Sequence, residues 1–163
     1  MSENDHSLFH NFNFSVVFND KQDLALHVQD VQLPSMAIGV TEQHGKYGKS
    51  NVLAGTSFVY EPLRFNWLLD ENLDTYFYFV NWLKTLANPR KVESFDFFSD
   101  ISVIIYNNNG LKLKTVNFEK CFPISLSEVL LSSKSRIDDS RVAMSVSFEF
   151  EDMLPGDKYT NHE

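Results

Sequence analysis

Cysteine, glycine, proline and long apolar runs are all scarce in this sequence. The single cysteine, Cys121, cannot form an intramolecular disulfide. Six glycines and five prolines in 163 residues exclude a collagen-like or low-complexity chain. No segment approaches the roughly 18 consecutive apolar residues of a membrane-spanning helix, and residues 1–30 lack the apolar core of a signal peptide. We therefore expect a soluble protein with no membrane partner, made in a reducing cytoplasm.

Basic residues are also in short supply, with 14 Lys and Arg against 22 Asp and Glu and a formal net charge of -8. Binding the DNA backbone requires clustered Lys and Arg, so this balance argues against a dedicated nucleic-acid-binding surface. The same charge balance is compatible with an acidic surface that DNA slides past without binding. The length predicts one domain, 1–163, with its core at about 12–152 and loose ends at 1–11 and 153–163.

Alternating apolar and polar residues predict β-strands along most of the chain. Residues 12–18 and 24–29 alternate around a turn at 19–21, which predicts a hairpin. An Asn-Gly turn at 107–110 predicts a second hairpin. Further strands are expected at 58–69, 101–106, 111–118 and 142–150, with a short segment at 121–126 broken by Pro123 and an exposed polar connection at 132–141.

One segment has helical spacing instead. Apolar residues three and four positions apart predict an amphipathic helix between Leu73 and Ala87, capped by Asp70 or Asn72 and ended by Asn88-Pro89. Its stripe consists of Leu73, Tyr76, Phe77, Val80, Leu83 and Ala87. Three more apolar residues extend beyond this stripe, so the helix is a candidate subunit interface, with simple core burial as the alternative. They are Phe79, Trp82 and Leu86.

Residues 39–56 hold four of the six glycines and little apolar periodicity, which indicates a long loop or a protruding hairpin. Such long connections are usually functional or disordered. Seven or so antiparallel strands with one helix predict a mainly β fold, either a β-sandwich or a partly closed barrel with the helix laid against it.

Catalytic, cofactor-binding and metal-binding residues are not apparent. Gly48-Lys49-Ser50 lacks the earlier glycine and the following helix of a phosphate-binding loop. His6 and His10 have the spacing of a metal pair but no third ligand. We expect neither an enzyme nor a cofactor.

Four landmarks occur in a fixed order over about residues 12–152. Residues 29–38, QDVQLPSMAI, are a strand that ends in Leu-Pro and restarts; residues 60–73 lead from YEPLRF to LDENL and into the helix. Residues 118–127, FEKCFPISLS, contain a central proline, and residues 142–150 are the closing strand. In this order they resemble the tail tube family of contractile-tailed bacteriophages, which includes the related baseplate tube initiator.

The resemblance implies a structural subunit that assembles into stacked hexameric rings around a channel for DNA, and kinship with type VI secretion tube proteins. The implied partners are further copies of the chain, tail sheath and baseplate proteins, and DNA that passes without sequence-specific binding. The implied location is the virion tail, assembled in the host cytoplasm. A baseplate tube initiator or a tail terminator of the same fold is the alternative. A small-ligand-binding β-barrel, with Phe and Trp lining a cavity, is the rival from another class.

Within a ring of such subunits, the sequence offers two more candidate surfaces. The polar side of the last strand is a candidate lumen face, with a solvated outer face as the alternative: Ser145, Ser147, Glu149 and Glu151. The Gly-rich segment is a candidate ring-stacking loop, with a flexible surface loop as the alternative: Gly39, Glu42, His44, Lys46, Tyr47, Lys49 and Leu53.

Overall fold

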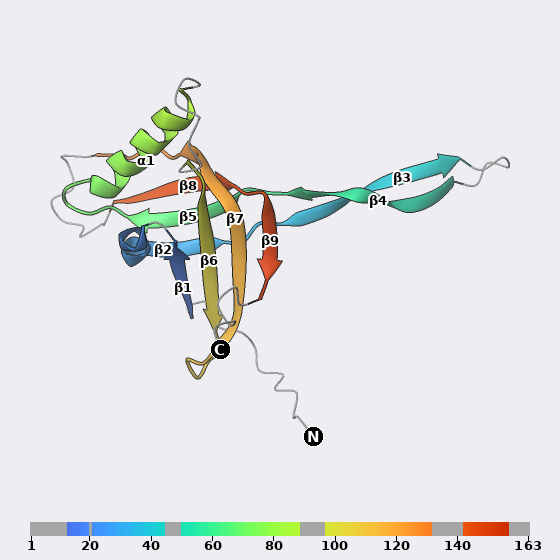
Figure 1. The fold of residues 1–163 in the computed structure, drawn as a ribbon, viewed down its shortest axis with the longest axis horizontal. Coiled ribbons are helices and arrows are strands. Elements are labelled where there is room, and N and C mark those ends of the chain that lie inside the picture. Colours follow the sequence, from blue (N-terminus) through green and yellow to red (C-terminus); the bar gives the residue numbers. More distant parts are fainter. Residues whose placement is uncertain (1–12, 20, 45–49, 89–96, 132–141, 157–163) are drawn as a thin grey trace.

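A computed structural model describes residues 13–19, 21–44, 50–88, 97–131 and 142–156 (Figure 1). The predicted loose N-terminus, the connection at 132–141 and the chain beyond residue 156 lie outside this description. The described elements are β1 (Phe14–Phe18), the 3₁₀-helix η1 (Gln22–His27), β2 (Val28–Gln32), β3 (Met36–His44), β4 (Ser50–Tyr60), β5 (Leu63–Leu68), α1 (Asp74–Leu86), β6 (Ser99–Tyr106), β7 (Lys112–Leu126), β8 (Ala143–Glu149) and β9 (Asp152–Pro155).

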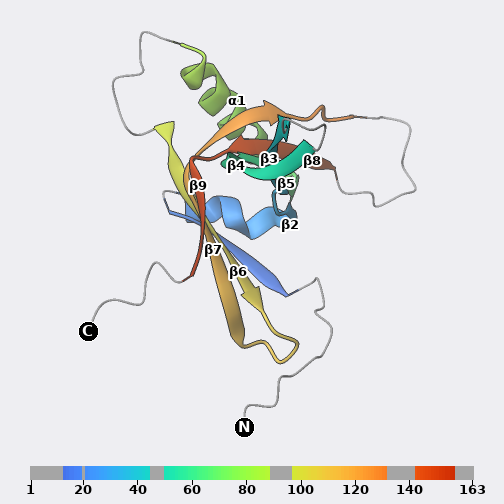
Figure 2. The same cartoon turned by 90° about the vertical axis from the view of Figure 1, so that its right-hand side faces the viewer.

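The strands are antiparallel and fall into two sheets. Seven of the described strands form one sheet in the order β1-β6-β7-β8-β5-β2, with β9 also paired to β7, while β3 and β4 pair with each other and with no other described strand. In Figure 1, β1, β6, β7 and β9 run across the direction of β2, β5 and β8, and Figure 2 shows the same crossing from the side. The seven-stranded sheet thus consists of two layers, one of β1, β6, β7 and β9 and the other of β2, β5, β8 and the end of β7. The described strands form no closed barrel, and the predicted mainly β architecture with one α-helix is confirmed.

The 15-residue strand β7 belongs to both layers. Its first part pairs with β6 and β9, and its last part pairs with β8. The strand bends at Lys120, which has a positive φ of 50° and whose backbone N–H donates to Asp100 Oδ1 at 2.9 Å. The sequence predicted two separate segments here. Pro123 does not end the strand, because a register shift between Pro123 and Ser125 accommodates the missing N–H donor.

Aromatic rings fill the space between the layers. Trp67 has no exposed surface, and its ring centroid lies 4.9 Å from that of Phe79 and 6.0 Å from that of Phe18. Phe148 and Phe65 complete the cluster, with their centroids 5.7 Å apart in an edge-to-face arrangement. Rings from β1, β5, β8 and α1 therefore hold both layers and the helix together.

The predicted hairpin of residues 12–18 and 24–29 is wrong. Residues 22–27 form η1, β1 pairs with β6, and β2 pairs with β5. Leu24 is buried and its carbonyl accepts a hydrogen bond of 2.8 Å from Trp67 Nε1, whereas Leu26 is 76% exposed. The alternation of Leu24 and Leu26 predicted a strand with both leucines on its buried face. In the structure only Leu24 is buried, in a 3₁₀-helix whose backbone bonds to Trp67.

The chain after β8 also differs from the prediction. Residues 153–163 were expected to be loose, but β9 pairs with β7 in the register Phe118 to Met153. Gly156 N–H donates to the carbonyl of Thr115 at 2.9 Å, and its own carbonyl accepts a bond of 2.8 Å from Asn117 Nδ2. This part of the predicted tail is therefore a strand of the sheet.

The start of α1 is capped by Asp70, one of the two predicted capping residues. Its carboxylate accepts the backbone N–H of Asp74 at 3.2 Å and that of Thr75 at 3.5 Å. Partial desolvation raises the pKa of Asp70, but these hydrogen bonds outweigh it and leave the pKa below its ordinary value of 3.8.

We expect Asp70→Ala to lower the free energy of unfolding by about 1 kcal/mol, because two amide groups at the start of α1 lose their acceptor. Urea unfolding at pH 7 measures this, with Asn72→Ala as the matched control. Because the pKa of Asp70 is lower in the folded state, its carboxylate stabilises the fold at pH values above the unfolded-state pKa. This stabilisation is lost as the pH falls through the folded-state pKa. The difference between wild type and variant should therefore shrink below pH 3.8, and a constant difference would contradict the assigned cap.

Candidate assembly interface

The β3–β4 hairpin projects from the body as a two-stranded arm (Figure 1). Its register runs from Met36 opposite Tyr60 at the base to His44 opposite Ser50 at the far end. Of the two predicted forms for residues 39–56, the structure therefore has the protruding hairpin.

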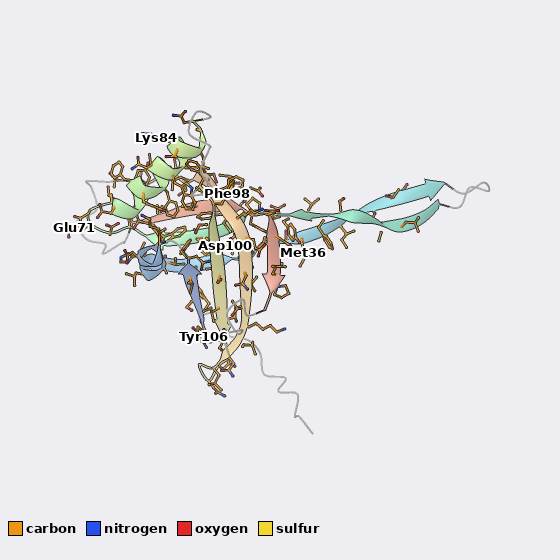
Figure 3. All side chains as sticks on the ribbon, viewed as in Figure 1. Met36, Glu71, Lys84, Phe98, Asp100 and Tyr106 are labelled. Carbon is orange, nitrogen blue, oxygen red and sulfur yellow. The ribbon has the colours of Figure 1, made fainter. Side chains whose placement is uncertain are left out.

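Large apolar side chains are exposed along the arm. Val40 is 70% exposed and Phe58 is 60% exposed. Figure 3 shows side chains standing off both sides of the two strands, beginning near the labelled Met36. Single exposed apolar residues are ordinary, but several of them on one projecting element indicate an interaction surface. The set comprises Met36, Ile38, Val40, Val52, Leu53, Phe58 and Val59.

The base of the arm is fixed to the body. The Tyr60 ring lies 5.3 Å from Phe150, which is buried, and Phe58 stacks on Tyr60 at 6.3 Å. The backbone N–H of Glu61 donates to the carbonyl of Ser35 at 2.9 Å across the two chain segments that enter the arm. The direction of the arm is therefore set by contacts with the body.

A close approach between the two backbones accompanies an irregularity within the arm. The register shifts between Ile38 and Val40, where Gly39 lies opposite the Gly55 region of β4. A Cβ added at Gly55 would collide with the backbone carbonyl of Gly39, whereas a Cβ at Gly39 would meet only Ser57 Oγ at 3.8 Å. Gly55 is required for close backbone approach, and Gly39 is not.

We expect Gly55→Ala to disturb the arm and Gly39→Ala to be tolerated, since only the first places a side chain against backbone. The core lies outside the arm, so both variants should melt near the wild-type temperature by near-ultraviolet circular dichroism. Limited proteolysis should cut the arm faster in Gly55→Ala than in Gly39→Ala. Equal cleavage of the two variants would show that the close approach does not hold the arm.

The predicted ring-stacking residues fall on this arm as far as they are described. Gly39 and Glu42 lie in β3 and Leu53 lies in β4, all three away from the core. His44 is the last residue of β3 and pairs with Ser50. Lys46, Tyr47 and Lys49 lie outside the described residues.

The buried face of α1 is centred on Phe79, which corrects the predicted stripe. Phe79 has no exposed surface, so it lies in the subunit's own core and cannot contact a neighbour. Trp82 stacks on Phe79 at 6.2 Å and donates from Nε1 to the Phe97 carbonyl at 2.9 Å, and Leu86 is half-buried. Phe77, which the spacing placed in the stripe, is 55% exposed.

The two helix phenylalanines should respond differently to truncation. We expect Phe79→Ala to cost about 3–5 kcal/mol of the free energy of unfolding, because it leaves a cavity among the rings of Trp67 and Phe148. Phe77→Ala should change it by no more than about 0.5 kcal/mol, because the ring is mostly in water. Urea unfolding of the two variants checks this, and comparable losses would contradict the orientation of α1.

The polar side of β8 forms part of a wider polar surface. Met144, Val146 and Phe148 are buried, and Ser145 and Ser147 between them are half-buried, as the alternation predicted. Cross-strand pairing continues this surface over β5 and β2. One row joins Gln32, Arg64, Ser147 and Ser125, and the next joins Asp30, Asn66 and Ser145.

Glu149 and Glu151 lie where this surface meets the bend of β7. Glu149 ends β8 opposite Phe122, whereas Glu151 lies beyond the strand and forms an ion pair with Lys120. The hydrogen bond and the charge of Glu151 raise the pKa of Lys120 above its ordinary value. The fourth predicted lumen residue, Glu151, is thus joined to the β7 bend by an ion pair.

The described residues offer no group of His, Cys, Asp and Glu side chains that could hold a metal ion. Cys121 is fully buried beneath the bend. None of the helices among these residues is long and apolar enough to cross a membrane. The notable features of the surface are therefore the apolar arm and the polar sheet face.

Comparison with known proteins identifies the family. The sequence model of the family described as phage tail tube protein matches residues 6–154. The chain belongs to the phage tail tube protein family. No curated protein sequence matches this chain.

Solved structures share the tail tube fold at low sequence identity. One is the sheath-tube complex of an extracellular contractile injection system, PVC, in the extended state, with a TM-score of 0.68, 15% identity and 92% of each chain covered. The sheath/tube terminator of the same system has a TM-score of 0.69 and 15% identity over 93% of this chain and 98% of that one. The baseplate of the anti-feeding prophage has a TM-score of 0.65 and 15% identity over 93% of this chain and 97% of that one.

Proposed function

We propose that this chain is a structural, non-catalytic subunit of a phage contractile tail tube. Subunits associate through repeated heterologous contacts into hexameric rings, and the rings stack into a hollow tube through which DNA passes. The family assignment supports the class of protein. The observation that carries the assembly mechanism is the apolar two-stranded arm.

An arm of this kind requires a partner. A two-stranded hairpin is at best marginally stable in water without a third strand or a packed face. Among the described strands, none pairs with the outer edges of the arm, and such open edges readily pair with another chain. Because the arm projects from its own body in Figure 1, a neighbouring subunit is the surface that covers it.

The apolar area of the arm makes a substantial contribution to association. Burying a half-exposed Val, Leu or Phe side chain contributes about 1 kcal/mol or more. Seven large apolar side chains are exposed on the arm. Their total is comparable with the roughly 4–15 kcal/mol that association costs in lost freedom, and contacts elsewhere on the subunit add to it.

The polar face of β2, β5 and β8 is the proposed lumen wall. Most of its side chains are serines and amides, and the negative charges of Asp30 and Glu149 outweigh the positive charge of Arg64 in the same rows, which disfavours phosphate binding. The acidic balance of the whole chain supports passage of DNA without sequence-specific binding. The function requires no cofactor. The remaining partners are sheath and baseplate proteins, and the subunit is assembled in the host cytoplasm and located in the virion tail.

A tube initiator or terminator is the second candidate, because the baseplate and terminator structures match this fold as well as the tube does, with TM-scores of 0.65 and 0.69 against 0.68. The two roles differ in assembly. A tube protein polymerises axially by itself, whereas an initiator or terminator stops after one or two rings.

The decisive experiment is negative-stain electron microscopy of the purified protein, with light scattering over a range of concentrations. We expect hollow tubes of one diameter from wild type. The double variant Val40→Asp with Val52→Asp should stay folded but unassembled, because it places two charges on one apolar face of the arm. Single rings that do not stack would favour the initiator or terminator. A persistent monomer of 18.8 kDa would contradict self-assembly.

A further inference from the structure

A cleft of about 650 Å³ opens at the bend of β7. Sites of roughly 300–1,000 Å³ enclose a small ligand, so this cleft has room for several side chains. In Figure 3 the labelled Phe98 and Asp100 mark its position at the start of β6. Its lining residues are Asn19, Phe98, Asp100, Lys120, Phe122, Glu149, Phe150 and Glu151.

Aromatic rings form the floor of this cleft. Phe98 and Phe122 meet edge to face with their centroids 5.7 Å apart, and Phe98 is 41% exposed. Phe150 is buried and packs against Phe118 at 5.0 Å. The cleft therefore offers fixed apolar surface that the aliphatic side chains of a partner can cover.

The charged groups at the rim of the cleft have different surroundings. Lys120 pairs with Glu151, and the Asp100 carboxylate accepts the backbone N–H of Lys120 at 2.9 Å. Both of these carboxylates are therefore engaged in the bend itself. Glu149 is half-buried at the end of β8 and lies opposite Phe122 in the strand register. It places a negative charge beside the aromatic floor, where a cation of a partner is attracted.

The end of the β6–β7 hairpin, residues 107–114, exposes apolar side chains. Leu111 is 67% exposed and Leu113 is 56% exposed. A register shift near Tyr106 gives β7 one extra residue here, and such bulges redirect side chains. Lys114 is also exposed, and the segment contains no acid. This hairpin end is therefore an apolar projection with positive charge on a chain whose net charge is -8.

Hydrogen bonds hold the hairpin end in one shape. Asn107 Oδ1 accepts the backbone N–H of Asn109 at 3.0 Å and that of Leu111 at 2.9 Å. Asn13 Nδ2 donates to the Asn107 carbonyl at 3.1 Å, which ties the turn to the residue before β1. The exposed leucines therefore lie on a preorganised turn, and preorganisation lowers the cost of ordering on binding.

The cleft and the hairpin end lie at opposite ends of the same strand. Figure 3 shows Phe98 and Asp100 at one end of β6 and Tyr106 at the other. The eight residues of β6 span about 26 Å at roughly 3.3 Å each. A subunit therefore cannot place its hairpin end in its own cleft, but a second copy displaced by this length along β6 brings the two surfaces together.

We propose that the cleft at the β7 bend receives the end of the β6–β7 hairpin of another subunit. Leu111 and Leu113 pack on the phenylalanine floor, and Lys114 pairs with Glu149. This inference rests on the proposed function and deepens it, because it names two surfaces through which neighbouring subunits meet. The contact is heterologous, with the hairpin of one copy in the cleft of the next, and can therefore repeat along an assembly.

The described strands of the arm, β3 and β4, are the competing occupant of the cleft. They are also apolar and exposed. However, Glu42 is the only Asp, Glu, Lys or Arg in these two strands, so they bring a like charge to Glu149 and no ammonium or guanidinium group. The hairpin end therefore fits the chemistry of the cleft better.

Disulfide trapping between two variants tests the contact. Subunits carrying Lys114→Cys are mixed with subunits carrying Glu149→Cys, assembled, and oxidised mildly; native Cys121 is fully buried and does not compete. Matched controls pair Lys114→Cys with Glu71→Cys at the exposed start of the helix, and Glu149→Cys with Glu42→Cys on the arm. We expect the first mixture to yield at least about ten times more disulfide-linked dimer than either control, because a disulfide requires Cα atoms within about 7 Å.

The outcomes of this experiment separate the inference from the proposed function. Tubes or rings that form normally without the Lys114–Glu149 cross-link, or with an equal yield from Glu42→Cys, overturn the inference and leave the proposed function standing. A wild-type protein that never leaves the monomer overturns both.

Charge exchange provides a second measurement that needs no new thiol. Lys114→Glu should raise the concentration required for assembly by about tenfold at low salt, whereas Lys84→Glu at the exposed end of α1 should leave it unchanged. Adding Glu149→Lys to Lys114→Glu should restore most of the loss, because opposite charges again face each other. The effect should weaken at high salt. Unchanged assembly in Lys114→Glu, or no restoration in the double variant, would contradict the proposed contact.

Discussion

The described part of the β3–β4 arm exposes large apolar side chains to water and has two strand edges open to pairing with another chain. A hairpin with no third strand has little stability of its own. The arm keeps its direction because Tyr60 packs on Phe150 and Glu61 bonds to Ser35 at its base. These few contacts fix where the arm starts, and we propose that another subunit covers the remaining apolar surface. The rest of the subunit can be understood as a rigid support for this contact.

Strand β7 provides that rigidity because it belongs to both layers. Its bend at Lys120 turns the chain from the β6 side to the β8 side, and the aromatic cluster around Trp67 locks the layers together. The same bend opens the acidic cleft and places it near Phe150, beneath the base of the arm.

Strands with clear alternation could be predicted from the sequence, and the closing strand with buried Met144, Val146 and Phe148 is the best example. The strand expected at 24–29 failed because the contact that decides it, Trp67 Nε1 to the Leu24 carbonyl, is 43 residues away in sequence. The helix was predicted, but the prediction placed the wrong side of it in the core. Phe79, and not Phe77, is buried against Trp67. The cleft could not be predicted, because its lining comes from four separate segments of the chain.

The central claim is that the arm is covered by another subunit in the assembled protein. Amide hydrogen exchange of residues 36–44 and 50–60, compared between the dissociated subunit and the assembly, tests this claim most directly. The account predicts fast exchange over the arm in the free subunit and strong protection after assembly, while the core strands β5 and β8 are protected in both states. Equal exchange of the arm in the two states would show that it remains in water and would contradict the account.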